Sequence, residues 1–135
     1  MDIQNTVAAV ENIASKTNSF DVVTGGFGIF PGDEPVVTLV LARNAQMTAL
    51  QNTIWTHCEK HMSSIKYFYS PDAWIPHITL MHHDINRDDI CHFLESVLSR
   101  EIQFRIKVDN LAVIYRDGNH LGQVSRFDLG KENFT

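Results

Sequence analysis

The run 36-VVTLVLA-42 limits the possible folds of this chain more than any other stretch. Its residues are nearly all apolar and mostly β-branched, and a Pro-Gly-Asp turn signal at 31–33 comes shortly before it. A strand of this composition is typical of the interior of a sheet, where both faces are covered. We therefore expect a sheet with this segment inside it.

Helical and strand patterns alternate along the rest of the chain. Apolar residues recur at three- and four-residue steps in three segments, which predicts helices over residues 3–15, about 45–62 and about 87–98. Extended segments are expected at 19–23, 27–30, 74–82 and 102–108, followed by a hairpin over 111–129 that turns at 117–119. This order predicts one α/β or α+β domain with a mixed or antiparallel sheet.

Length, composition and charge are those of an ordinary soluble protein. The 135 residues, 44% of them hydrophobic, suffice for one domain with a buried core. A formal net charge of −5 without a Lys/Arg cluster argues against an extended nucleic-acid surface, which needs a positive stripe. The sequence shows neither a bilayer-spanning run nor a secretory signal, so we expect no membrane attachment. Cys58 and Cys91 are then expected to be reduced thiols in a cytoplasmic protein.

The chemistry-bearing residues of the chain lie in 72-DAWIPHITLMHHD-84. Residues two apart on a strand face the same side, so His77 and Thr79 present an imidazole and a hydroxyl together. Pro76 lacks a backbone donor and suits the first residue of a strand. Such a pair can hold a phosphate oxygen while the imidazole moves a proton. The structural alternative is a strand histidine that simply hydrogen-bonds to a neighbour.

The segment 76-PHITL-80, preceded by Asp-Ala-Trp and followed by an acidic turn and a helix, resembles the 2H phosphoesterase superfamily. The upstream 25-GGFGIFPGDEPVVTLVL-41 also follows the order of that family, and the resemblance covers residues 3 to 129. It implies a pair of lobes, each with one His-x-Thr strand facing a shared cleft. It also implies that two histidines act as general base and acid on a 2′,3′-cyclic phosphate or a 2′-5′ linkage, without metal or cofactor.

The chain departs from the family pattern because it holds one His-x-Thr, at 77–79, and no histidine before His57. Residues 1–15 match the helix that follows the first motif strand in relatives. The opening strand, first helix and first motif strand of the family are therefore expected to lie upstream of Met1, so that either the chain begins late or it is a natural form with a single motif. On this view residues 1–32 are the remnant of the first lobe, and residues 35–135 form the second lobe of a single 2H phosphoesterase-like domain.

Further residues near the motif are candidate substrate contacts. Regular alternation would place residues 77, 79, 81 and 83 on one face, which makes His83 the candidate for an extra phosphate donor. Tyr67 and Tyr69 precede the motif and could stack on a base, although ordinary packing is the alternative. The run 57-HCEKH-61 lacks the glutamate that a zinc-protease motif has after its first histidine, so we expect no metal site there.

Two functions follow from these observations. The first is a phosphoesterase that acts on RNA ends or small nucleotides, with His77 as one acid–base group, Thr79 on the phosphate and a second histidine supplied from elsewhere. The second is a non-catalytic or truncated member that binds nucleotide phosphate or a protein partner. Loss of a strand-helix-strand block would bare a sheet edge and an apolar face, which predicts a homodimer.

Overall fold

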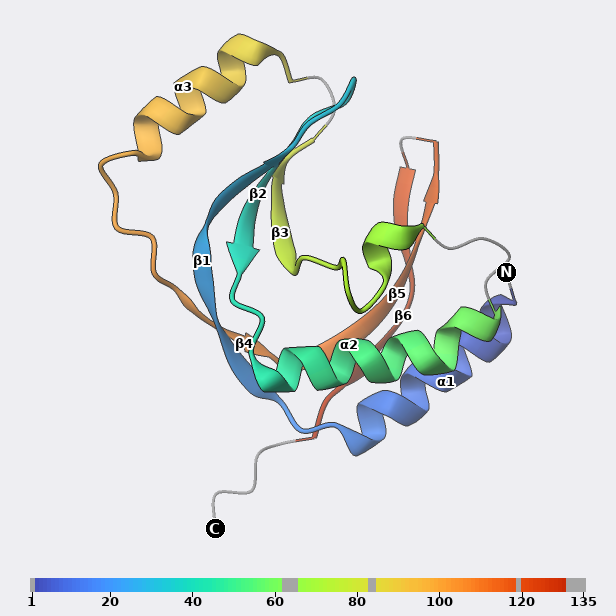
Figure 1. Ribbon diagram of the computed structural model, residues 1–135. Helices are drawn as coiled ribbons and strands as arrows, with labels where there is room; N and C mark the ends of the chain where they lie inside the picture. The colour runs from blue at the N-terminus through green and yellow to red at the C-terminus, as the bar shows by residue number, and fades with distance from the viewer. Residues whose placement is uncertain (1, 62–65, 83–84, 119, 131–135) are drawn as a thin grey trace. The chain divides into compact units, whose positions relative to one another are not determined.

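The computed structural model describes residues 2–61, 66–82, 85–118 and 120–130, and these form an α+β fold with three α-helices (Figure 1). This agrees with the predicted fold class. The elements in chain order are α1 (Ile3–Lys16), β1 (Phe20–Phe30), β2 (Val36–Leu41), α2 (Ala45–Cys58), the 3-10 helices η1 (Glu59–His61) and η2 (Tyr67–Tyr69), β3 (His77–Met81), α3 (Arg87–Val97), β4 (Arg105–Val108), β5 (Asn110–Asp117) and β6 (His120–Asp128). None of the helices in these ranges is long and apolar enough to cross a membrane.

The strands form one four-stranded sheet in the order β3-β2-β1-β4 and one two-stranded sheet of β5 and β6. The pairs β1–β2, β2–β3 and β5–β6 are antiparallel. Strand β2 is an inner strand, and its residues Val37, Thr38 and Leu39 are all buried. The expectation drawn from its apolar, β-branched sequence is confirmed, because a strand with neighbours on both sides needs cover on both faces.

Two compact units make up the chain. Unit 1 comprises Met1–Asp21, Asn44–Trp74 and Lys107–Thr135, and unit 2 comprises Val22–Arg43 and Ile75–Ile106. The resemblance implies another division of the chain, into lobes of residues 1–32 and 35–135. That division stays a prediction.

Unit 1 contains the helices α1 and α2. Helix α1 buries Val10, Ile13 and Ala14 and contacts α2, β5 and β6. Helix α2 begins after Asn44, whose side chain accepts a hydrogen bond from the backbone of Met47, and this satisfies a free donor of the first turn. Helix α2 buries Met47, Leu50 and Cys58, which together with the buried residues of α1 belong to the core of the unit.

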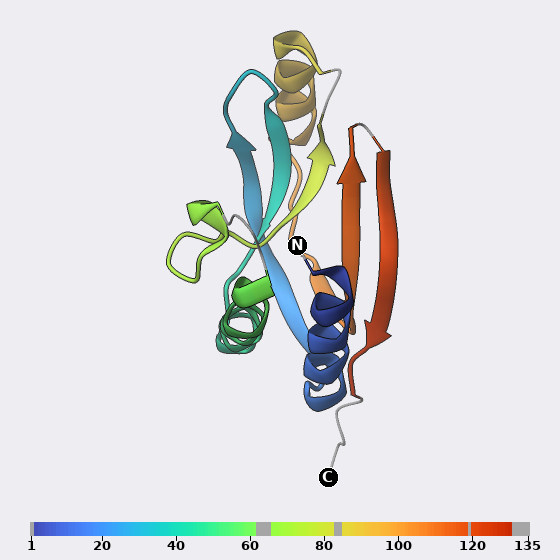
Figure 2. The same ribbon diagram turned by 90° about the vertical axis from the view of Figure 1, so that its right-hand side faces the viewer.

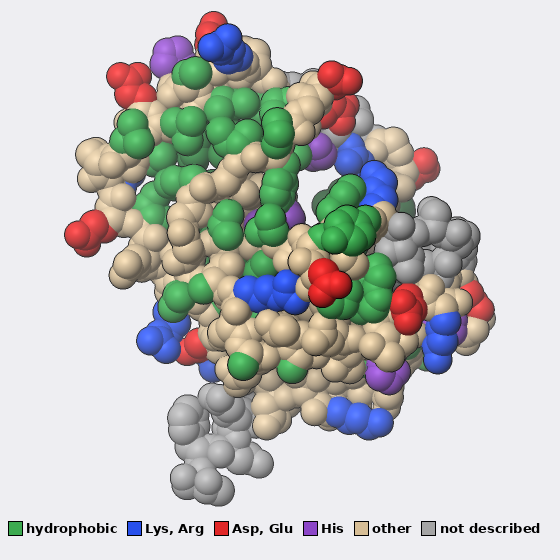
Figure 3. Space-filling view, viewed as in Figure 1, with side chains coloured by type: hydrophobic (Ala, Val, Ile, Leu, Met, Phe, Trp, Pro, Cys, Tyr) green, Lys and Arg blue, Asp and Glu red, His purple; other side chains and the backbone are tan. Residues whose placement is uncertain are grey.

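Unit 2 contains α3 and the strands β1, β2 and β3, which lie side by side (Figure 2, blue, teal and yellow-green). Helix α3 starts at a reciprocal capping box between Asn86 and Asp89, as its sequence predicts. The ring of Phe93 meets that of Phe27 edge-on, with centroids 5.3 Å apart, so α3 covers the face of the sheet on which Phe27 lies. Figure 3 shows hydrophobic side chains gathered in the region of α3 and β1.

Several strand boundaries differ from the predicted ones. Residues 19–23 and 27–30 were expected as two pieces, but β1 is one strand, because the Gly25-Gly26 pair forms a bulge against β2 and not a break. Gly26 has a φ of +124°, which only glycine adopts readily. Strand β3 begins at His77, directly after Pro76, and β4 begins only at Arg105.

Candidate functional site

One face of the sheet in unit 2 carries both motif side chains. In the register of β2 and β3, His77 pairs with Val40, and Thr79 pairs with Thr38. In the register of β1 and β2, Val40 pairs with Gly26 and Thr38 with Gly28. Paired residues of antiparallel strands point to the same side, so these six residues share one face, called here the histidine face.

Helix α3 covers the opposite face. Phe27 pairs with Leu39, and Leu39 pairs with Ile78, so these three residues alternate with those of the histidine face. Since Phe27 packs on Phe93 of α3, the helix lies on their side of the sheet. Within unit 2 the helix therefore does not cover His77 and Thr79, and both side chains are exposed.

The imidazole of His77 is held at two points. Its Nδ1 lies 2.7 Å from the backbone oxygen of Ile75. Its ring meets the ring of Phe30 edge-on, with centroids 4.9 Å apart. A carbonyl oxygen can only accept, so this bond places the proton of the neutral ring on Nδ1 and leaves the lone pair on Nε2. The ring is thus oriented with its basic nitrogen directed away from the backbone anchor.

The glycines of β1 leave the histidine face without side chains of their own beside the motif. A Cβ at Gly28 would come within 2.9 Å of a methyl group of Val40 and 3.0 Å of the hydroxyl of Thr38. The Thr38 hydroxyl donates to the Gly28 oxygen at 3.2 Å, so it is engaged in the sheet. The hydroxyl that remains available to a ligand on this face is that of Thr79, which is exposed.

A bulge in β3 changes which residues after the motif belong to the histidine face. Thr38 pairs with Thr79, but the next residue, Val37, pairs with Met81, so Leu80 is an extra residue on β3. Met81 therefore takes the side of Val37, and the expected alternation through residue 81 is wrong. His83 lies outside the described residues, and its role as a phosphate donor stays a prediction.

Tyr67 and Tyr69 belong to η2 in unit 1, where Tyr67 is 75% exposed. Tyr69 lines an apolar cavity of about 600 Å³ together with Trp55 and Trp74. The side-chain amide of Gln51 donates a hydrogen bond to the backbone oxygen of Tyr69 at 2.9 Å, which holds η2 against α2. This hydrogen bond fixes the backbone of Tyr69, and stacking on a base stays a prediction for both tyrosines.

The run 57-HCEKH-61 divides between different environments. Cys58 is buried, and burial raises the pKa of its thiol. The Nδ1 atom of the exposed His57 is hydrogen-bonded to the backbone oxygen of Thr53 at 2.8 Å. Among the residues that the structure describes, no group of three metal-ligating side chains comes together.

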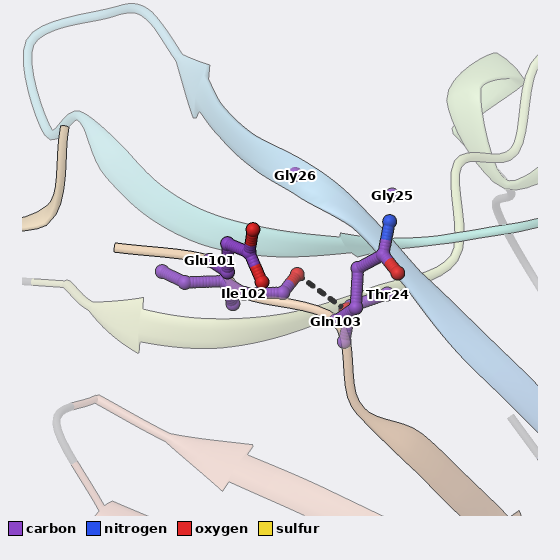
Figure 4. A pocket seen from close by; sticks show the side chains of 6 residues that line it. All are labelled: Thr24, Gly25, Gly26, Glu101, Ile102 and Gln103. Atoms are coloured by element: carbon purple, nitrogen blue, oxygen red, sulfur yellow. Dashed lines mark hydrogen bonds between the residues drawn. The ribbon is translucent and has the colours of Figure 1, made fainter. Parts of the chain in front are cut away.

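A polar pocket beside β1 was not foreseen from the sequence. It has a volume of about 350 Å³ and is lined by Thr24, Gly25, Gly26, Glu101, Ile102 and Gln103, all from unit 2 (Figure 4). The Thr24 hydroxyl donates to the Ile102 oxygen and accepts from the Phe104 nitrogen, both at 2.9 Å. The segment before β4 thus follows β1 without forming a ladder, and the pocket lies between them.

The family model of the 2′-5′ RNA ligase superfamily matches residues 2–120, which is most of the chain. No curated protein shows significant similarity to it.

Proposed function

Because the chain belongs to the 2′-5′ RNA ligase superfamily, within the 2H phosphoesterases, we propose that His77 and Thr79 act on a phosphodiester. The substrate class is a 2′,3′-cyclic phosphate or a 2′-5′ linkage, at an RNA end or in a small nucleotide. The observation that carries this proposal is the anchored imidazole of His77 beside the exposed Thr79 hydroxyl.

The two side chains have complementary tasks. Their Cα atoms lie two strand residues apart, roughly 6.5–7 Å, so one phosphate can contact both side chains. The Thr79 hydroxyl donates to a non-bridging oxygen of the phosphate. The Nε2 atom of His77 accepts a proton from the attacking water or, once protonated, gives one to the departing ribose oxygen.

Hydrolysis needs two proton transfers on opposite sides of phosphorus. Water attacks phosphorus and loses a proton, while the bond from phosphorus to the ribose oxygen breaks and that oxygen gains a proton. The single His-x-Thr in residues 1–135 supplies one of these groups. Turnover therefore depends on a second acid–base group, from another copy of the chain or from protein outside these residues.

The alternative is a member that binds nucleotide phosphate or a partner protein without turnover. The same single motif favours it, because loss of one of two coupled proton-transfer groups lowers the rate by orders of magnitude. In that case the histidine face would still bind phosphate through Thr79 and a protonated His77.

The test is hydrolysis of a short RNA ending in a 2′,3′-cyclic phosphate, over a range of protein concentrations. We expect His77→Ala to lower the rate by about 100-fold or more, since general acid–base catalysis contributes on this scale. The matched control is His57→Ala, which removes an exposed histidine with a similar local bond from unit 1.

The concentration dependence separates the possible sources of the second group. A rate that rises faster than linearly with protein indicates that a second copy of the chain supplies it, as the predicted homodimer would. Full activity in His77→Ala would overturn the catalytic assignment. If no concentration gives turnover but phosphate-bearing nucleotides bind in a manner that requires Thr79, the non-catalytic alternative holds.

A further inference from the structure

We propose that Phe30 is a positioning residue for His77, because its ring fixes the plane of the imidazole and so holds the Nε2 atom in one direction for proton transfer. The inference rests on the proposed function, in which His77 moves a proton. It adds to the site a residue of β1, far in the sequence from the His-x-Thr motif on β3.

The register of the sheet places Phe30 on the histidine face. Phe30 is the last residue of β1 and pairs with Val36 of β2. It continues the two-residue period that puts Gly26 and Gly28 on this face, and the pairing from Gly26 to Phe30 is regular. The contact between Phe30 and His77 therefore passes over β2, which lies between β1 and β3 in unit 2.

The two rings meet in an arrangement that aromatic side chains prefer. Their planes are 76° apart, and their centroids are separated by 4.9 Å. In such an edge-to-face contact the positive edge of one ring lies against the negative face of the other. Phe30 is half-buried, whereas His77 is exposed. The more firmly packed ring thus supports the more exposed one.

The backbone anchor alone leaves the imidazole one freedom. The hydrogen bond between Nδ1 and the Ile75 oxygen, at 2.7 Å, holds one atom of the His77 ring. Around this single bond the ring can still rock, because the χ2 torsion of histidine has a broad energy well. The Phe30 ring contacts the imidazole at a second place and restricts the rocking. Together the two contacts leave Nε2 with one direction, which is the preorganisation that proton transfer needs.

The kinetic test uses substitutions that keep or remove the flat ring. Phe30→Leu keeps an apolar side chain but loses the ring, and we expect kcat on the 2′,3′-cyclic-phosphate RNA to fall about 10-fold, since a small misplacement of a reacting group suffices for such a loss. KM should change little, because Thr79 still binds the phosphate. Phe30→Tyr restores the ring and should restore most of the rate. The matched control is Phe27→Leu on the same strand, which loses the edge-on contact with Phe93 on the opposite face and should keep the wild-type kcat.

A spectroscopic measurement reads the ring of His77 without turnover. At alkaline pH the ¹⁵N shifts of its two ring nitrogens report which of them carries the proton. Wild type should show the proton on Nδ1, as the bond to Ile75 requires. In Phe30→Leu the two shifts should move toward each other, because the ring leaves the carbonyl part of the time and both tautomers form. Phe30→Tyr and Phe27→Leu should keep the wild-type spectrum.

The outcomes distinguish this inference from the proposed function. The expected change in the His77 spectrum of Phe30→Leu, without any turnover by wild type, would support the positioning of the imidazole and overturn catalysis. Turnover that requires His77, together with a wild-type kcat or an unchanged spectrum in Phe30→Leu, would overturn the positioning role and support catalysis. An equal loss of kcat in Phe27→Leu and Phe30→Leu would also overturn it, since a general loss of stability would then explain both. So would a raised KM with unchanged kcat in Phe30→Leu, which would indicate a direct contact with the substrate.

Discussion

Replacing Thr24 by valine tests how the segment before β4 is held against β1. The Thr24 side chain is 7% exposed, and its hydroxyl bonds to the Ile102 oxygen and the Phe104 nitrogen, both at 2.9 Å. Valine has nearly the same shape and keeps the β-branched backbone preference, but it can make neither bond. The change therefore removes two hydrogen bonds and leaves a carbonyl and an amide without their partner.

The expected cost follows from the surroundings of the two bonds. An unsatisfied buried polar group costs about 1–3 kcal/mol. Ile102 is half-buried and Phe104 is 54% exposed, so water can partly replace the lost partner, and the lower end of that range applies to each group. We expect Thr24→Val to lower the free energy of unfolding by about 2 kcal/mol, which corresponds to roughly 6–10 °C in Tm for a chain of this length.

Thr24→Ser provides the matched control, because it keeps the hydroxyl and loses only a methyl group, at about 1 kcal/mol. Thermal unfolding gives the stability of both variants, and amide hydrogen exchange reads the local bond. The Phe104 amide should exchange faster in the valine variant and near its original rate in the serine variant. If the two variants unfold at the same temperature and exchange at Phe104 alike, the hydroxyl does not hold this segment.

Three further changes have defined outcomes. Asn86→Ala removes the acceptor of the α3 capping box and should cost about 1 kcal/mol, measured by thermal unfolding, with loss of helical circular dichroism. Burial raises the pKa of the Cys58 thiol. The contribution of this thiol to stability is therefore present below the ordinary thiol pKa and is lost as the pH rises through the raised pKa. A thiol reagent at pH 8 should modify the exposed Cys91 first and the buried Cys58 only on unfolding. Gly122→Ala places a Cβ 2.3 Å from the ring of Tyr115, so the ring must swing aside, at about 1 kcal/mol and with a visible change in its NMR shifts.

Features set by local sequence could be predicted well. Helix α3 carries its own start signal at Asn86, and the turn of the β5–β6 hairpin lies where the sequence places it, with Gly118 at a φ of +58°. The shared side of His77 and Thr79 needed only the two-residue period of a strand. Each of these conclusions depends on residues close together in the chain.

Features set by pairing between distant segments could not be predicted. The bulge at Leu80 arises from the pairing of β3 with Val37 and Thr38 of β2, and nothing in the sequence of β3 marks it. The polar pocket beside β1 exists because the segment before β4, some 80 residues away in the sequence, does not continue its strand pairing with β1 beyond Thr24. A hydrophobic pattern shows which residues tend to be buried, but it does not show where a ladder of hydrogen bonds ends.

The bulge and Pro76 also bear on how β3 resists aggregation. In the described sheet β3 is an outer strand, and outer strands offer free backbone groups to other chains. Pro76 ends the regular edge on one side and the bulge at Leu80 ends it on the other, so only residues 77–79 keep regular strand geometry. Three residues are too few to template a neighbouring strand. The motif strand can therefore stay open to a ligand without recruiting a second sheet along its edge.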